Sequence, residues 1–118
     1  MVTREQAEAI ADEWIAAWNA HDVPRVLSHY LDDFEMQSPK IAAVAGEPTG
    51  VLRGKPAIEA YWRKAMAMAP GLRFEKLGVF VGAQSVAIHY RNHQDKLVVE
   101  VLELDAAGKV HRGAAHYM

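Results

Sequence analysis

The sequence predicts an α+β fold, with helices in the first half of the chain and strands in the second. Apolar residues recur at helical spacing over residues 4–19 and 55–69. From residue 72 onward, four segments of strand length are rich in β-branched and aromatic residues. Helices followed by a run of strands favour an antiparallel sheet with the helices packed on one face.

Two helices are expected at the start of the chain. Thr3 and Gln6 have the spacing of a capping box at the start of the first helix. The apolar face of this helix comprises Ala7, Ile10, Ala11, Trp14, Ala17 and Trp18. Asp22, with Pro24 in the first turn, is typical of the N-cap of a short second helix, which would carry Val23, Val26, Leu27 and Tyr30 inward.

The middle of the chain is less regular. Residues 34–38 alternate with a period of two, so we expect a strand with Phe34, Met36 and Ser38 on one face. Residues 40–54 are rich in Ala, Gly and Pro and suit a loop or a loose short hairpin. A third helix should begin near Lys55 and end at Pro70-Gly71, with one apolar stripe formed by Ile58, Tyr61, Trp62, Ala65, Met66 and Ala69. The expected strands are residues 72–81, 85–92, 96–104 and 109–117.

Composition limits the classes of function. The 118 residues suit a single domain spanning residues 1–118, without repeats or linkers. A net charge of −2 with scattered basic residues argues against a nucleic acid partner. The absence of cysteine excludes disulfides and thiolate chemistry. No apolar run is long enough to span a membrane and no secretory signal is evident, so we expect a cytoplasmic protein that does not bind membranes.

Four motifs occur in the same order and at similar spacing as in a known family: residues 17–22, 31–34, 54–58 and 105–110. With them the chain resembles the nuclear transport factor 2-like superfamily, in particular the branch of SnoaL-like polyketide cyclases and ketosteroid isomerases. The resemblance implies a cone in which a curved antiparallel sheet wraps the helices around an internal pocket. It also implies a homodimer, which many members form through the outer face of the sheet. Members include enzymes and binding modules, so the fold alone does not decide the function.

The resemblance to ketosteroid isomerase can be followed residue by residue. That enzyme pairs a carboxylate base with a tyrosine and a protonated carboxylic acid at the oxyanion. The tyrosine falls on Trp14, the base on Ser38 and the acid on Glu100. A serine cannot take a proton from carbon without a base beside it, so this mechanism is not expected here. Trp14 could still donate its indole N–H to a ligand carbonyl.

Glu100 is the first candidate for a catalytic residue. It interrupts the apolar run Leu97–Leu102, which is typical of a strand buried on both faces. A carboxylate there must be paired or protonated, and burial could raise its pKa toward neutrality. The structural alternative is an ion pair with Arg91 or Arg112, or a place in a dimer contact.

The partner of Glu100 depends on the turn between Asn92 and Lys96. With Gln94-Asp95 as a two-residue loop, His89 lies opposite Glu100 and the two form an acid/base pair. A slip of one residue would place Ile88 and Tyr90 there instead. The six histidines lack the spacing of a metal site, so neither metal nor cofactor is expected.

A hydrophobic pocket is expected around the aromatic and methionine side chains, with the ligand-binding residues Trp14, Trp18, Met36, Ser38, Trp62 and Met66. The first functional hypothesis is a cofactor-free isomerase, cyclase or dehydratase that acts on a small hydrophobic carbonyl or hydroxyl compound, with Glu100 and His89 as the catalytic residues. The alternatives are a non-catalytic ligand-binding module and a dimerisation domain with a filled core. Two or more titratable groups converging in the cavity would distinguish an enzyme from a binding module.

Overall fold

The computed structural model describes residues 1–118 and contains four helices and six strands. The elements are α1 (Arg4–Asn19), α2 (Val23–Leu27), β1 (Tyr30–Gln37), α3 (Pro39–Ala45), β2 (Val51–Arg53), α4 (Lys55–Met68), β3 (Glu75–Val81), β4 (Ser85–Arg91), β5 (Leu97–Leu104) and β6 (Val110–Tyr117). No helix is both long enough and apolar enough to cross a membrane.

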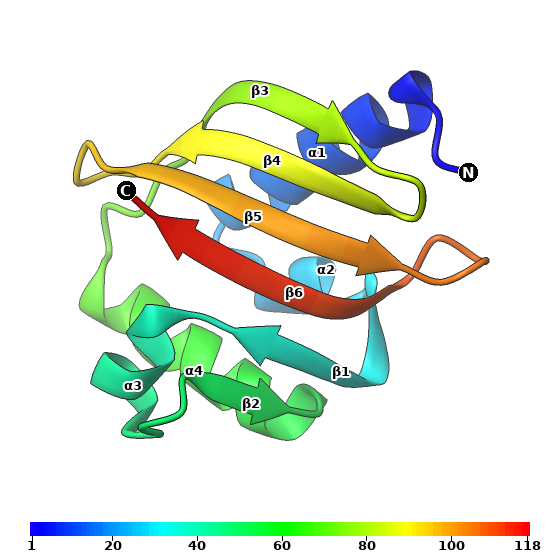
Figure 1. Cartoon of the computed structure of the whole chain (residues 1–118). Helices are drawn as coiled ribbons and strands as arrows, with labels where there is room; N and C mark the ends of the chain where they lie inside the picture. The colour runs from blue at the N-terminus through cyan, green and yellow to red at the C-terminus, as the bar shows by residue number, and fades with distance from the viewer.

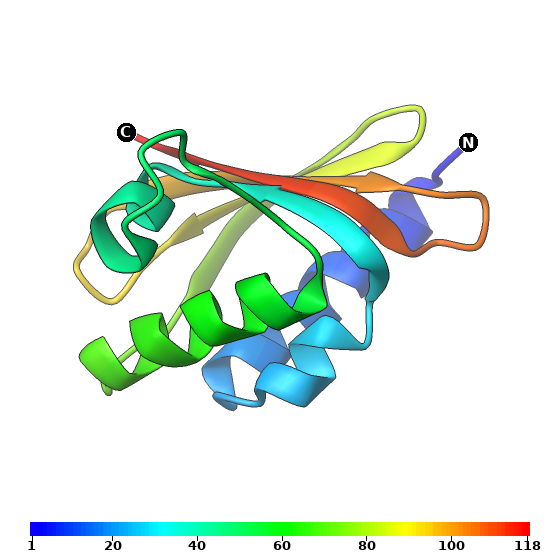
Figure 2. The ribbon, with the colours of Figure 1, turned by 90° about the horizontal axis from the view of Figure 1, so that it is seen from below.

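The six strands form one curved sheet in the order β2-β1-β6-β5-β4-β3 (Figure 1). The predicted meander β3–β6 is confirmed, and each of its pairings is antiparallel. One pairing departs from the expected antiparallel sheet, because β1 runs parallel to β6. Helices α1, α2 and α4 all lie against the same face of the sheet (Figure 2), as the α+β prediction requires.

The predicted helix starts are confirmed. The Thr3 side chain accepts a hydrogen bond from Gln6 N, the Gln6 side chain accepts one from Thr3 N, and the Asp22 side chain accepts one from Arg25 N. These bonds satisfy backbone donors that the first helical turn leaves free.

Two local predictions were wrong. Residues 40–54, expected as a loop or hairpin, contain α3 and β2. Ser38 caps α3 at its start, Gly46 ends it in the left-handed conformation at φ 74°, and β2 pairs with β1. Tyr30 was expected in the second helix but begins β1, where it pairs with Val110.

The core lies between the concave face of the sheet and the helices. It comprises 25 buried hydrophobic residues, of which Phe34, Ile41, Ile58, Ile88 and Leu102 are among the largest that are fully buried. Its centre is a group of aromatic rings with centroids 4.3–5.9 Å apart: Trp14, Trp18, Tyr30, Phe34, Trp62, Phe74 and Tyr90. The edge-to-face and tilted arrangements are those that aromatic pairs prefer.

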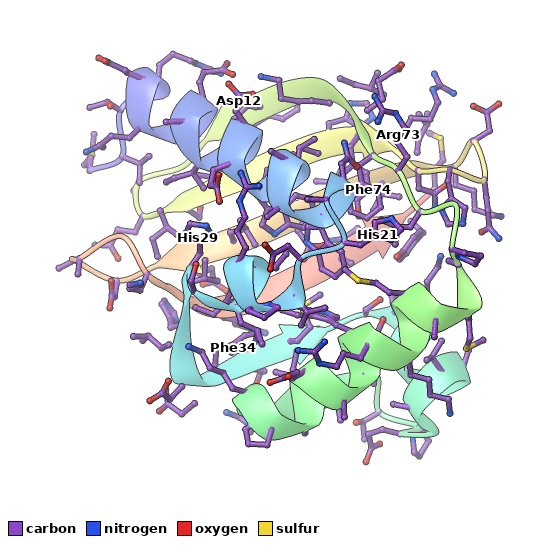
Figure 3. All side chains as sticks on the ribbon, turned by 180° about the vertical axis from the view of Figure 1, so that it is seen from behind. Asp12, His21, His29, Phe34, Arg73 and Phe74 are labelled. Atoms are coloured by element: carbon purple, nitrogen blue, oxygen red, sulfur yellow. The ribbon has the colours of Figure 1, made fainter.

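Asn19, at the end of α1, fastens the segment before β3. Its side chain donates to Phe74 O at 2.9 Å and accepts from Phe74 N at 2.7 Å, and Phe74 lies beside this end of the helix (Figure 3).

We expect Asn19→Ala to lower the free energy of unfolding by about 1–3 kcal/mol, because two partly buried backbone groups lose their partner. Urea denaturation measures the change. The exposed Lys64→Ala should change it by less than about 0.5 kcal/mol; a similarly small effect of Asn19→Ala would contradict the assignment.

Candidate functional site

A cavity of about 220 Å³ is lined in part by residues of α3, the β4–β5 turn and the C-terminal end of α4. These three segments lie at the same end of the molecule (Figure 2). Its inner wall is buried and consists mainly of Trp14, Trp18, Met36, Ser38, Tyr61, Trp62, Tyr90 and Glu100. More exposed residues surround its mouth, among them Lys40, Met68, Leu72, His93 and Gln94. The lining is predominantly hydrophobic with a few polar groups, which is typical of a site for a small organic ligand.

Glu100 lies in the wall of this cavity with only 2% of its surface exposed. The two arginines that could have paired with it bond other carboxylates: Arg91 bonds Glu75 and Asp95, and Arg112 bonds Glu35 and Glu103. Burial without a compensating partner raises the pKa of Glu100 to about 8, because the charged form loses its hydration. At pH 7 the carboxyl group is therefore mostly protonated, yet it can release its proton close to neutral pH.

Four tyrosines lie near Glu100: Tyr30, Tyr61, Tyr90 and Tyr117. Burial raises the pKa of each phenol, and the nearby Glu100 carboxylate raises it further. The Ser38 hydroxyl acts in the opposite direction on Tyr61 and Tyr117. All four phenols are thus protonated at neutral pH, and three of them line the cavity as potential hydrogen-bond donors.

Trp14 does not have the role that the sequence suggested. Its indole N–H donates to the Tyr30 hydroxyl at 3.0 Å inside the core, so this donor is already satisfied and is not free for a ligand carbonyl. The Trp14 ring still lines the cavity. Trp18 differs, because its indole nitrogen is buried without any hydrogen-bond partner.

His89 does not pair with Glu100. In the observed register Ile88 lies opposite Glu100 and His89 lies opposite Val99, so His89 is on the other face of the sheet. The β4–β5 turn has three residues between Asn92 and Lys96, with Asp95 in the left-handed conformation at φ 65°, rather than the two-residue loop assumed from the sequence. The pairing of His89 with Glu100 was therefore wrong, and the alternative register with Ile88 and Tyr90 is the one that occurs.

Most of the predicted pocket residues line the cavity, with one exception. Trp14, Trp18, Met36, Ser38 and Trp62 all do so. Met66 is buried in the core outside the cavity lining, whereas Met68, two residues later, lines the mouth with 65% of its surface exposed. The cavity-lining tyrosines were not among the functional candidates predicted from the sequence, although Tyr61 was on the predicted apolar stripe.

No three His, Cys, Asp or Glu side chains lie close enough together to hold a metal ion. His89 and His116 both lie opposite Val99, on the outer face of the sheet. The prediction that neither metal nor cofactor takes part remains an expectation.

The SnoaL-like domain model matches residues 11–117, nearly the whole chain. The chain belongs to the SnoaL-like family. A SnoaL-like protein of unknown function from Burkholderia thailandensis is 48% identical, with a TM-score of 0.95 over 99% of this chain and 98% of that one. Comparison with curated proteins finds no match.

More distant structures share the fold of this SnoaL-like chain. A candidate isomerase of the SnoaL-like family from Agrobacterium tumefaciens is 18% identical, with a TM-score of 0.77 over 97% of this chain and 98% of that one. A candidate polyketide cyclase from Sinorhizobium meliloti is 14% identical, with a TM-score of 0.75 over 92% of this chain and 94% of that one. At these identities the similarity shows the nuclear transport factor 2-like fold and nothing about the reaction.

The bond between Trp14 and Tyr30 can be measured by a double-mutant cycle. We expect Trp14→Phe and Tyr30→Phe each to lower the free energy of unfolding, because each leaves a buried polar group without its partner. The double variant should lose less than the sum of the two, by about 1 kcal/mol. Urea denaturation of the four proteins gives this coupling energy, and strict additivity would argue against the bond.

The raised pKa of Glu100 makes the stability of the protein depend on pH. Between the ordinary pKa of 4.5 and about 8, the folded state holds a proton that the unfolded state has released. Raising the pH through this window therefore destabilises the fold by about 1.4 kcal/mol per pH unit, and the effect levels off above pH 8.

Glu100→Gln keeps the shape of the neutral acid but cannot ionise. We expect wild type and Glu100→Gln to be similarly stable near pH 5, and the variant to become progressively more stable than wild type up to about pH 8. Urea denaturation at pH 5, 7 and 9 measures the difference. A difference that does not change with pH would show that Glu100 titrates alike in the folded and unfolded states.

Proposed function

We propose that this protein is a cofactor-free proton-transfer catalyst of the isomerase or cyclase type, acting on a small hydrophobic carbonyl compound. One observation carries the proposal: Glu100 is a buried, unpaired carboxyl group in the wall of an aromatic-lined cavity, with a pKa of about 8. An acid or base works best when its pKa is close to the working pH, which this group satisfies.

The surrounding groups give Glu100 a chemical role. In its ionised form the carboxylate can take a proton from the carbon next to a carbonyl group. In its neutral form it can return that proton to another carbon of the same molecule, which is an isomerisation. The negative charge that develops on the carbonyl oxygen needs hydrogen-bond donors, and the protonated phenols of Tyr61, Tyr90 and Tyr117 line the same cavity.

A non-catalytic binding module is the second candidate. It is favoured by one observation: His89, the expected partner base, lies on the opposite face of the sheet. Glu100 is then the only carboxyl group in the cavity lining. Homodimer formation remains a prediction in either case.

Exchange of the C2 protons of 1-indanone with D₂O, followed by proton NMR, tests the catalytic proposal. We expect wild type to accelerate the exchange and Glu100→Gln to reduce the acceleration by about 10²-fold. The catalysed rate should rise with pH and level off above about pH 8, as the carboxylate form accumulates. Glu103→Gln is the matched control, because Glu103 is on the same strand but bonds Arg112 outside the cavity.

Two results would contradict catalysis by Glu100. Equal acceleration by wild type and Glu100→Gln would remove Glu100 from the reaction. If 1-indanone changes the tryptophan fluorescence of wild type but its protons exchange at the rate found in buffer, the protein is a binding module. All three tryptophans line the cavity, so their fluorescence reports occupancy.

A further inference from the structure

We propose that the ligand of this cavity is an anion, a small aromatic or alicyclic keto acid whose carboxylate binds Lys40 at the mouth while its carbonyl group lies beside Glu100. The inference rests on the proposed function for the position of the carbonyl group. It adds the charge of the ligand, its orientation and the residue that recognises it.

Lys40 is the basic residue built into the cavity mouth. It lies in the first turn of α3, where its backbone N–H donates to the Ser38 hydroxyl at 3.2 Å. Its ammonium group lies 5.0 Å from the centre of the Tyr117 ring, and both side chains line the cavity. Ser38 and the Tyr117 ring therefore hold Lys40 at the entrance.

Lys40 forms no ion pair with an acidic side chain of the protein. Lys55 bonds Asp32 and Lys76 bonds Glu8 and Asp12, whereas the ionisable group that acts on Lys40 is another cation, Lys96. Burial and the positive charge of Lys96 both lower the pKa of Lys40. A partly desolvated ammonium group without an acidic side chain beside it is a good position for an anion to bind, because the anion compensates for the lost hydration and offsets the repulsion from Lys96.

The remaining charges of the cavity favour the same class of ligand. Glu100 is the only acidic group in the lining and is mostly neutral at pH 7, whereas Lys40 is a cation at the mouth. The cavity is thus electropositive at its entrance and neutral inside, in a chain whose net charge is −2. An anionic group would remain at the entrance, close to water, and the apolar part of the ligand would lie among the aromatic rings.

The volume of the cavity limits the size of the ligand. A dry cavity of about 150 Å³ can hold benzene. The 220 Å³ available here therefore suits one substituted ring or a small bicyclic compound rather than a fused compound of three or more rings. A ring with a carbonyl group at one end and a carboxylate at the other satisfies both polar ends of the site.

The test compares 4-acetylbenzoate with 1,4-diacetylbenzene, which replaces the carboxylate by a neutral acetyl group and keeps the ketone. Binding is followed by tryptophan fluorescence at pH 7 and low salt. We expect wild type to bind 4-acetylbenzoate about tenfold more tightly. Lys40→Gln should lose most of this preference with little change toward 1,4-diacetylbenzene, and Lys40→Arg should restore it. Lys64→Gln is the matched control, because it removes an exposed lysine outside the cavity lining.

The possible failures are distinguishable. Equal affinity of wild type for the two compounds, or an unchanged preference in Lys40→Gln, would overturn the role of Lys40 and leave the proposed function standing. Binding of 1,4-diacetylbenzene without binding of 4-acetylbenzoate would also overturn the role of Lys40 and leave the proposed function standing. Binding of neither compound would count against both the anionic ligand and the proposed function. Urea denaturation of Lys40→Gln checks that a loss of binding is not a loss of folding.

Discussion

The burial of the Glu100 carboxyl group without a partner is the constraint on which the site depends. The strand that carries it is otherwise apolar on its inner face, with Val98 and Leu102 on either side. Small residues on β6 leave it room: Ala115 lies opposite it, and a Cβ at Gly113 would lie 3.1 Å from Met36 Sδ and 3.7 Å from Glu100 Oε1. Because the space beside the carboxyl group holds no counter-ion, protonation is the way in which the folded chain accommodates it.

On the outer face of the same sheet, a largely covered glutamate is stabilised in its charged form instead. Glu35 on β1 is also largely covered, yet it bonds Arg53, Arg112 and Gln37. The hydrogen bond from Gln37 has the largest effect on the pKa of Glu35, and the charges of the two arginines add to it. Together they outweigh the effect of burial and lower this pKa. Two glutamates of one sheet thus differ in charge at pH 7, because Glu35 bonds Gln37 and two arginines whereas Glu100 is buried without a partner. The difference follows from the face on which each lies, which the strand period determines.

Much of this arrangement could be predicted from the sequence, and the failures have physical reasons. Glu100 was recognisable because it interrupts an apolar strand, and the helices were recognisable from their caps and apolar faces. The position of His89 could not be predicted, because it depends on the length of the turn between β4 and β5. The turn has three residues, with Asp95 in the left-handed conformation, and the resulting one-residue shift in register places His89 on the face opposite to Glu100. The parallel pairing of Tyr30 with Val110 is a long-range contact that leaves no local pattern. Helix α3, although rich in alanine, lies where Gly and Pro favoured a loop.

Ser38 shows how this chain departs from ketosteroid isomerase, in which the general base occupies the corresponding position. Here the residue is a serine, and its hydroxyl caps α3 instead of taking a proton. The cap fixes the start of the helix that brings Lys40 to the mouth of the cavity. The group able to exchange protons near neutral pH is then on the wall of the sheet, at Glu100. In the proposed function, the end of the first strand therefore shapes the entrance of the cavity, and the central sheet carries the group that transfers the proton.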